Sequence, residues 1–336
     1  MWEKIANQNL GIKAKERLVI LADEPVDVPL DAEVIIVPSD RSHGQEPARE
    51  VWESVFGAAA LGPLELDGVL DRIIDKNITD DDEKAISIWQ SKIGDVIPNA
   101  VIAITYFSTS HTAFRRILAG AGCRYASMPL FDMELLREGG PLDVDQSAMA
   151  KRTQNMAAQL NGASDVHITT PIGTDFRFSV KGRDFHADDG DLTQKGSFGN
   201  LPAGGAYCAP VEGTGEGRLV IQEGFALIVE KGQVVSLEGE AKDDSAQEEK
   251  DLARIFQENR DWLQLAELGI GTNENASRID NLLEEEKIMG TVHIAFGDNS
   301  GFGGKQKIPY HRDHVLWEPT LIVDGTNVTL PQKGTT

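Results

Sequence analysis

Cysteine is scarce in this chain of 336 residues, which contains only Cys123 and Cys208. Two thiols so far apart argue against a disulfide framework or a zinc knuckle, and they indicate a reduced compartment in which both are buried structural residues. Long apolar runs are also missing, because no stretch approaches the roughly 20 residues that a helix needs to cross a bilayer. The N-terminus lacks the charged, apolar and small segments of a secretion signal. We therefore expect a cytoplasmic protein that does not bind membranes.

Basic residues are outnumbered, with 32 Lys and Arg against 54 Asp and Glu, which gives a formal charge of −22. A field of this sign repels phosphate backbones and therefore argues against nucleic acid and anionic membranes as partners. The chain also lacks a GxGxxG motif after its first strand-like run and a GxxxxGK[ST] motif, so nucleotide binding has no support.

The first half of the chain alternates short apolar strands with helical stretches. Residues 16–23, 32–39 and 99–108 are compact runs of strand length, and residues 143–164 form a long helical stretch. This alternation is typical of a layered α/β domain with a mostly parallel sheet. Because single cores tend to stop growing near about 250–300 residues, we expect a second domain as well.

Composition changes near residue 164, where short strands separated by turn signals begin. The hairpin turns at Lys231-Gly232 and Asp324-Gly325 are typical of antiparallel strands. One helix interrupts them, over residues 245–265, with Ser245 and Glu248 at the spacing of a capping box. We predict an α/β protein with two domains: a layered α/β domain over residues 1–164 and a β-rich, barrel-like domain over residues 165–330, which carries the metal site.

Several side chains that commonly bind metals lie close together within residues 286–315, namely His293, His311, Asp313 and His314. Residues two apart on a strand point to the same face, so His311 and Asp313 converge while His314 points away. His293 lies in an apolar, strand-like run and approaches the same point if the glycine-rich loop after it folds back. Two imidazoles and one carboxylate form a metal-binding set.

Each of these signals also has a purely structural explanation. A lone histidine in an apolar strand is more often a hydrogen-bonded core residue than a ligand. A metal site also needs a further carboxylate, and Glu267 is the candidate, because it lies past a helix and before a GIGTN turn that would aim it into a cleft. The alternative for Glu267 is a solvated carboxylate at a helix end.

His111 is a candidate substrate contact. It lies in the first turn of a predicted helix that follows a buried strand, which is where ligands bind in open α/β sheets. The alternative is a side chain that is hydrogen-bonded at the helix start.

Five motifs appear in a fixed order along the chain: SHTAFRRILAGAGCRYASMP, TTPIGTDFRFSVKGR, GNLPAGGAYCAPVEGTGEG, AELGIGTN and KIMGTVHIAFGDN followed by HRDH. In this order they resemble the aminopeptidase T (PepS-like) metallo-aminopeptidases and the related dihydroxypyridine ring-cleaving dioxygenases. The resemblance extends over residues 100–326 and is more specific than any one motif.

The resemblance implies a homodimer in which a cleft between an α/β domain and a β-barrel-like domain binds divalent metal. The positions that match the ligand motifs are Glu267, His293, His311 and Asp313. Glu267 and His293 are also implied as catalytic residues. The metal would be Zn, Co or Mn in an aminopeptidase and Fe(II) in a dioxygenase.

The chain departs from the aminopeptidase pattern at two positions. Gly205 in NLPAGGAY stands where the motif NLPxGEV carries a glutamate ligand. A tyrosine expected about a turn after His293 is missing, with Ser300 near that place, and Tyr310 is the nearest candidate for a substrate contact. Loss of one terminal carboxylate weakens one site of a two-metal centre. Glu212, seven residues after Gly205, could replace it in space.

Three functions remain open at this point. The leading prediction is a metal-dependent aminopeptidase-like hydrolase that removes N-terminal residues from small peptides, with Glu267 as bridging ligand or base. The alternative is a mononuclear non-haem Fe(II) dioxygenase that cleaves a small dihydroxypyridine-like ring, with His293, His311 and Asp313 as ligands. The third is a binding protein of the same fold that has lost catalysis, because of Gly205.

Overall fold

The computed structural model describes residues 1–22, 26–36, 97–105, 108–110, 113–239, 247–308 and 310–333. The chain forms two compact units: Met1–Gln146 with Gly190–Ala203, and Ser147–Asp189 with Gly204–Thr336. The domain limits 1–164 and 165–330 stay a prediction, because compactness alone does not show that a segment folds independently. None of the helices within the described ranges is long and apolar enough to span a membrane.

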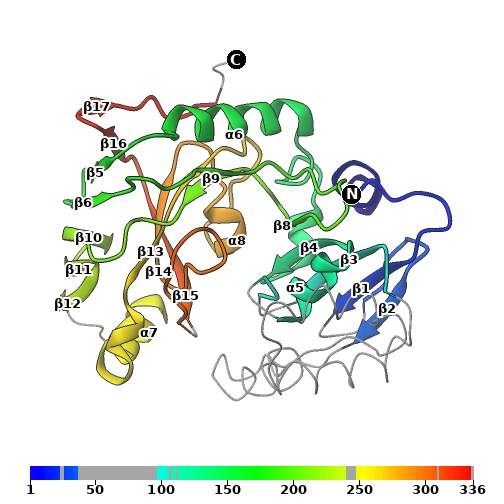
Figure 1. Ribbon diagram of the computed structural model, residues 1–336, viewed down its shortest axis with the longest axis horizontal. Helices are drawn as coiled ribbons and strands as arrows, with labels where there is room; N and C mark the ends of the chain where they lie inside the picture. The colour runs from blue at the N-terminus through cyan, green and yellow to red at the C-terminus, as the bar shows by residue number, and fades with distance from the viewer. Residues whose placement is uncertain are drawn as a thin grey trace. The chain divides into compact units, whose positions relative to one another are not determined.

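The first unit contains a parallel five-stranded sheet of order β2-β1-β3-β4-β8 (Figure 1). Its strands are β1 (Leu18–Ala22), β2 (Glu33–Ile36), β3 (Ala100–Thr105), β4 (Arg124–Pro129) and β8 (Phe198–Asn200). The strands β1 and β3 are buried along their whole length, as the apolar runs predicted. The predicted α/β class with a mostly parallel sheet is confirmed.

Helical segments accompany this sheet: α1 (Trp2–Lys4), η1 (Ile5–Asn9), α5 (Ala113–Gly120) and η4 (Met133–Leu136). The long helix α6 (Gln146–Leu160) follows and lies within the predicted stretch 143–164. Its residues Met149, Thr153, Met156 and Leu160 are buried. Their spacing of three and four places them on one face, as in an amphipathic helix that covers a core.

The second unit consists of two antiparallel sheets. The seven-stranded sheet has the order β12-β11-β10-β6-β5-β16-β17, and the five-stranded sheet has the order β15-β14-β13-β9-β7. The strands of the larger sheet are β5 (Asp165–Thr169), β6 (Asp175–Ser179), β10 (Glu216–Gln222), β11 (Phe225–Glu230), β12 (Gln233–Glu238), β16 (Thr320–Val323) and β17 (Thr326–Asn327). Those of the smaller sheet are β7 (His186–Asp188), β9 (Gly205–Cys208), β13 (Leu265–Gly271), β14 (Val292–Gly297) and β15 (His311–Leu316).

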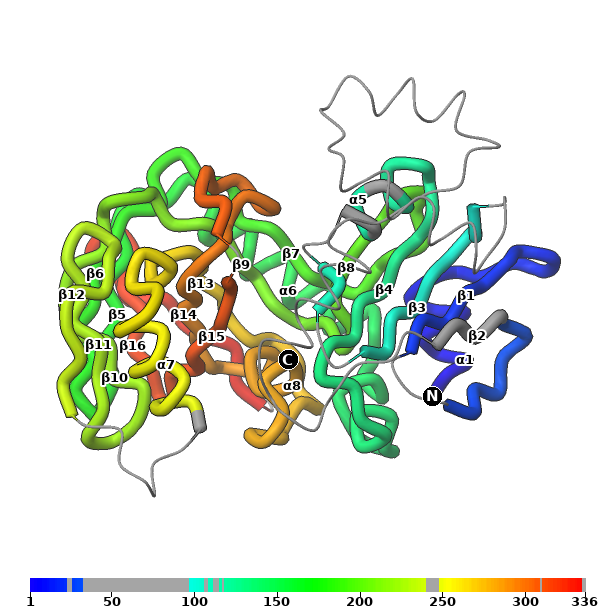
Figure 2. Tube along the Cα trace, turned by 90° about the horizontal axis from the view of Figure 1, so that it is seen from below, coloured from blue at the N-terminus to red at the C-terminus, as the bar shows by residue number. Residues whose placement is uncertain are grey.

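Both sheets contribute to one hydrophobic core, to which Phe176 and Leu227 come from the larger sheet and Leu268 and Ile294 from the smaller. Helices α6 and α7 (Gln247–Glu258) also pack side chains into it. Figure 2 shows β13, β14 and β15 side by side in this unit. The predicted β-rich second half is therefore confirmed.

Two predicted hairpin turns are present. Lys231 and Gly232 join β11 to β12 with φ of 51° and 77°, and Asp324 and Gly325 join β16 to β17 with φ of 48° and 78°. Positive φ at both central residues is the geometry that matches the twist of the flanking strands.

The helix predicted over residues 245–265 is shorter than expected. Helix α7 ends at Glu258, a 3₁₀ turn η5 (Arg260–Trp262) follows, and β13 begins at Leu265. The short helix α8 (Leu282–Glu285) comes before β14. Ser245, the predicted cap, lies outside the described residues. Glu267 is predicted to lie past a helix and just before a turn at GIGTN; instead it lies within β13, which continues to Gly271 as a central strand paired with both β9 and β14.

Candidate metal centre

The centre lies on three neighbouring strands, β13, β14 and β15. Glu267 on β13 pairs with Ala295 on β14, and Ala295 pairs with Asp313 on β15. Residues opposite each other in an antiparallel sheet share a face, so the two carboxylates flank Ala295 on the same side. His293 and His311 each lie two residues from this row and share its face.

A β-bulge at Ala266 puts Glu267 on that face. Leu265 pairs with Phe296, but the next paired residue on β13 is Glu267, which pairs with Ala295. Because of the extra residue, the side chains that follow it on β13 point to the opposite face of the sheet from the one they would otherwise have. Without it, Glu267 would point to the opposite face, away from the histidines.

The imidazole of His293 occupies space that a side chain at Gly269 would fill. Gly269 pairs with His293, and a Cβ at Gly269 would lie 1.9 Å from the Nε2 atom of His293. Because glycine has no side chain, the ring can lie across β13, where its Nε2 atom is 3.4 Å from Glu267 Oε1.

A backbone contact orients His311. Its Nδ1 atom lies 2.8 Å from the carbonyl oxygen of Asp298, so Nδ1–H donates to that oxygen. The lone pair is then on Nε2, which faces the carboxylates. Such contacts commonly fix the tautomer and ring orientation of a metal-binding histidine.

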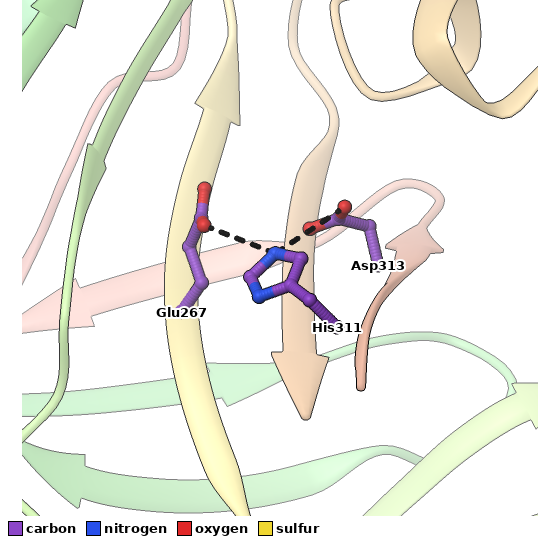
Figure 3. A group of neighbouring side chains, drawn as sticks. All are labelled: Glu267, His311 and Asp313. Atoms are coloured by element: carbon purple, nitrogen blue, oxygen red, sulfur yellow. Dashed lines mark ion pairs between the residues drawn. The ribbon is translucent and has the colours of Figure 1, made fainter. Parts of the chain in front are cut away.

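The donor atoms of Glu267, His311 and Asp313 lie within 4.8 Å of one another (Figure 3). The Nε2 atom of His311 is 3.4 Å from Glu267 Oε2 and 3.8 Å from Asp313 Oδ2, and the Nε2 atom of His293 is 4.0 Å from Asp313 Oδ1. Donors about 2.1 Å from one ion are spaced by about 3–3.5 Å. The observed spacing is therefore close to that of ligands around a cation.

The electrostatics of the centre favour positive charge. Burial lowers the pKa of the His311 imidazole, but the carboxylates of Glu267 and Asp313 outweigh burial and raise it to about 10. Burial also lowers the pKa of His293, but the carboxylates of Glu267, Asp313 and Glu286 outweigh burial and raise it above its ordinary value. The carboxylates therefore stabilise either protons on the imidazoles or a metal ion that displaces them.

Unpaired buried atoms also fit a cation. Asp313 Oδ1 is buried and has no hydrogen-bond partner among the residues that the structure describes. An unpaired buried carboxylate oxygen is costly, and a metal ion would satisfy it. The donor set of two imidazoles and two carboxylates suits Zn, Mn or Fe(II).

One acidic member of the region is not indicated by the sequence pattern. Glu286, at the end of α8, forms a second group of potential ligands with His293 and Asp313, whose donor atoms lie within 4.8 Å of one another. Glu286 begins the segment 286–315, but no spacing rule connects a residue after a short helix to a strand face. Its place follows from the turn between α8 and β14.

The other predicted site residues have different surroundings. His111 lies outside the described residues. His314 is on the opposite face of β15, where its Nδ1 atom is 2.5 Å from Glu248. Tyr310 stacks on Trp262, with ring centroids 6.4 Å apart, and its role as a substrate contact stays a prediction.

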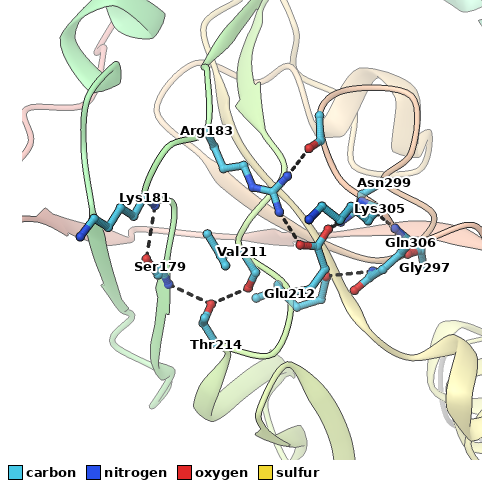
Figure 4. Close-up of polar contacts among 12 residues, drawn as sticks. Ser179, Lys181, Arg183, Val211, Glu212, Thr214, Gly297, Asn299, Lys305 and Gln306 are labelled. Carbon is cyan, nitrogen blue, oxygen red and sulfur yellow. Dashed lines mark hydrogen bonds and ion pairs between the residues drawn. The ribbon is translucent and has the colours of Figure 1, made fainter.

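Glu212 does not replace the missing carboxylate. It pairs with Arg183 and accepts hydrogen bonds from the backbone of Lys305 at 2.7 Å and from Asn299 at 3.3 Å (Figure 4). It therefore anchors the loop between β14 and β15. Ser300, near the place expected for a tyrosine, donates its hydroxyl to Asp298.

An aromatic wall stands beside the centre. The ring of Phe302 meets that of His311 edge-on, with centroids 6.1 Å apart, and the ring of Tyr207 meets that of Phe302 at 5.6 Å. Neither residue is indicated by the sequence pattern, because only the folded loop brings Phe302 to β15.

Two solved structures show which class of protein has this fold. The chain is 16% identical to 2,5-dihydroxypyridine dioxygenase from Pseudomonas putida KT2440, with a TM-score of 0.68 over 98% of this chain and 94% of that one. It is also 16% identical to wild-type AmpT (aminopeptidase T) from Thermus thermophilus, with a TM-score of 0.57 over 97% and 96% of the two chains. At these identities the likeness shows a shared fold, which is one used by enzymes.

The family follows from the sequence match. Residues 141–334, more than half of the chain, match the 2,5-dihydroxypyridine 5,6-dioxygenase family (NicX). The chain belongs to this family, and the predicted resemblance to the superfamily is confirmed. No curated protein matches the chain at a significant level.

Proposed function

We propose that this protein is a mononuclear non-haem Fe(II) dioxygenase that cleaves the ring of a small dihydroxypyridine-like substrate. The observation that carries the proposal is that His293, His311 and Asp313 share one sheet face, with each imidazole within 4.0 Å of the Asp313 carboxylate, among the residues that match the dioxygenase family. Two imidazoles and one carboxylate on one side of an ion leave open positions for a substrate and O₂.

The residues of the centre would have different roles in binding the metal. Bound Fe(II) supplies the O₂ chemistry. His293, His311 and Asp313 would hold it, and the carbonyl of Asp298 keeps His311 in the tautomer that offers Nε2. Glu267, 3.4 Å from both imidazoles, adds a second carboxylate, so that the charge of the donor set balances a divalent ion.

The aromatic wall supports a planar substrate. The ring of Phe302 lies next to His311, the ring of Tyr207 lies next to Phe302, and both side chains are half-buried. Aromatic rings pair favourably at centroid distances of about 4.5–7 Å, so such a wall orients a flat ring near the centre. A peptide N-terminus would instead be expected to require a carboxylate or carbonyl that pairs with its ammonium group.

A two-metal aminopeptidase is the second candidate, and one observation favours it. Two ligand groups, Glu267 with His311 and Glu286 with His293, share Asp313. A shared carboxylate is what bridges two ions in co-catalytic hydrolases. Gly205, which stands where those enzymes carry a glutamate, counts against this candidate.

The test compares the two chemistries on one preparation. Protein loaded with Fe(II) without oxygen is mixed with air and 2,5-dihydroxypyridine, and O₂ uptake is followed together with loss of the ring absorbance. The same protein loaded with Zn²⁺, Co²⁺ or Mn²⁺ is incubated with short peptides. We expect ring cleavage in the first assay and no released amino acid in the second; peptide hydrolysis without ring cleavage would refute the proposal.

His311→Ala should weaken metal binding by more than about 100-fold, because loss of contacts around a ligand alone costs about 10–100-fold. Metal content after dialysis measures this change. The matched control is His167→Ala, which removes a histidine of β5 that pairs with Asp175 at 2.8 Å, outside both ligand groups. Metal retained in H311A would show that the ligand assignment is wrong, and no metal in the parent protein would favour the binding-protein alternative.

A further inference from the structure

Lys287 is a buried cation next to the centre. Its Nζ atom lies 2.9 Å from Glu286 Oε1 and 3.1 Å from Asp188 Oδ2. Its backbone is held on both sides, because its N–H donates to the carbonyl of Glu284 at 3.0 Å and its carbonyl accepts from Asn273 at 2.9 Å. The ammonium group is therefore placed by the fold and is not a mobile surface charge.

Lys287 neutralises Glu286, which belongs to the second ligand group and not to the first. Glu286 groups with His293 and Asp313, and Asp313 also belongs to the group formed with Glu267 and His311. Two groups that share a carboxylate have the layout of a site for two ions. In this chain the second group already has a positive charge beside it.

Gly205 leaves room for this lysine. A Cβ at Gly205 would lie 3.5 Å from the Nζ atom and 3.8 Å from the Cδ atom of Lys287. Gly205 is paired with Asp188 across β7 and β9, and Asp188 binds the same ammonium group. A longer acidic side chain at position 205 would extend toward the place that the lysine occupies.

The environment keeps Lys287 charged. Its ammonium group is buried within ion-pair distance of two carboxylates, those of Glu286 and Asp188. Two like charges in a buried site repel strongly, because little water screens them. A divalent ion on Glu286 would therefore have to displace or neutralise the ammonium group.

We propose that Lys287 serves as a fixed cation in place of a second metal ion, and so limits the centre to one ion. The proposal rests on the metal centre of the proposed function, but not on ring cleavage. Lys287 then has a positioning role, because it pairs with Glu286. His293 and Asp313 are left to bind the single ion, together with His311 and Glu267.

The experiment is a titration of metal-free protein with Co²⁺, followed by visible absorbance and by metal analysis after gel filtration. We expect one ion per chain for the wild type, even in excess Co²⁺, and one for Lys287→Arg, which keeps the charge. Lys287→Met should bind two ions per chain. The double variant E286Q/K287M should return to one, because the carboxylate that attracts the second ion is gone.

Each outcome decides the proposal. One ion in K287M, or two in E286Q/K287M, would overturn it. Two ions in the wild type would also overturn it, whether or not K287M folds. Failure of ring cleavage with these stoichiometries intact would count against the dioxygenase only, whereas ring cleavage with one ion in K287M would count against the role of Lys287 only.

Discussion

His293 depends on a residue that has no side chain. Its ring lies where the Cβ of any other residue at position 269 would be, because that Cβ would lie 1.9 Å from Nε2. The glycine of the AELGIG run is therefore part of the centre, although it binds nothing. It permits the close approach of an imidazole to a neighbouring strand.

Gly269→Ala should consequently weaken metal binding while the β-rich unit stays folded. The added methyl group displaces the imidazole, and we expect a loss of affinity of about 10–100-fold, as for other changes that misorient a ligand. Competition with a chromogenic chelator measures the affinity. Gly120→Ala is the control, since a Cβ at Gly120 of α5 would have no neighbour within 4 Å. Equal affinity in both variants would contradict this account of His293.

At the scale of elements, the loop between β14 and β15 determines whether His293 and His311 lie close to the same point. Glu212 holds this loop through Lys305 and Asn299, and Arg183, its ion-pair partner, donates to the carbonyl of Gly303 (Figure 4). Burial raises the pKa of Glu212, but these donors outweigh burial and lower it, so the carboxylate stays charged. The same loop carries Asp298, which orients His311.

Glu212→Ala should release the loop. The change removes the acceptor shared by Arg183 and two loop donors. Because Glu212 is half-buried and its contacts are partly screened by water, we expect the unfolding free energy to fall by about 2 kcal/mol, the contribution of a single hydrogen bond to a charged group. Limited proteolysis should then cut within residues 299–306, and metal affinity should fall. Glu238→Ala, which removes an exposed partner of Arg218, is the control. An uncut loop in E212A would show that other contacts hold it.

At the scale of the whole molecule, all proposed ligands belong to the second unit. An ion that binds the folded state and not the unfolded state stabilises it by about 2.7 kcal/mol at 100 times its dissociation constant. This stabilisation should appear in the unit that contains the ligands.

We therefore expect Zn²⁺ to slow hydrogen exchange in peptides that cover β13, β14 and β15. Peptides that cover β1, β3 and β4 of the first unit should exchange at the same rate with and without the ion. Mass spectrometry of exchanged peptides measures both, and a chelator should reverse the effect. Protection confined to the first unit would contradict the placement of the centre.

Much of the architecture could be predicted because it depends on local patterns. The apolar run of β3, the positive-φ turn at Lys231-Gly232 and the face of α6 all follow from residue types at short spacing. The extent of α7 could not, because the residues after Glu258 form a 3₁₀ turn that leads into β13, and β13 pairs with β9, which lies far away in the chain.

The sequence by itself determined which residues could bind a metal: His311 and Asp313 share a face because a strand repeats every two residues. Only the tertiary structure decided how they combine. The bulge at Ala266 turns Glu267 to the histidines, since one extra residue reverses a strand's faces. The burial of Lys287 beside Gly205 places a cation next to the centre, because residues more than 80 positions apart meet only once the sheet has formed.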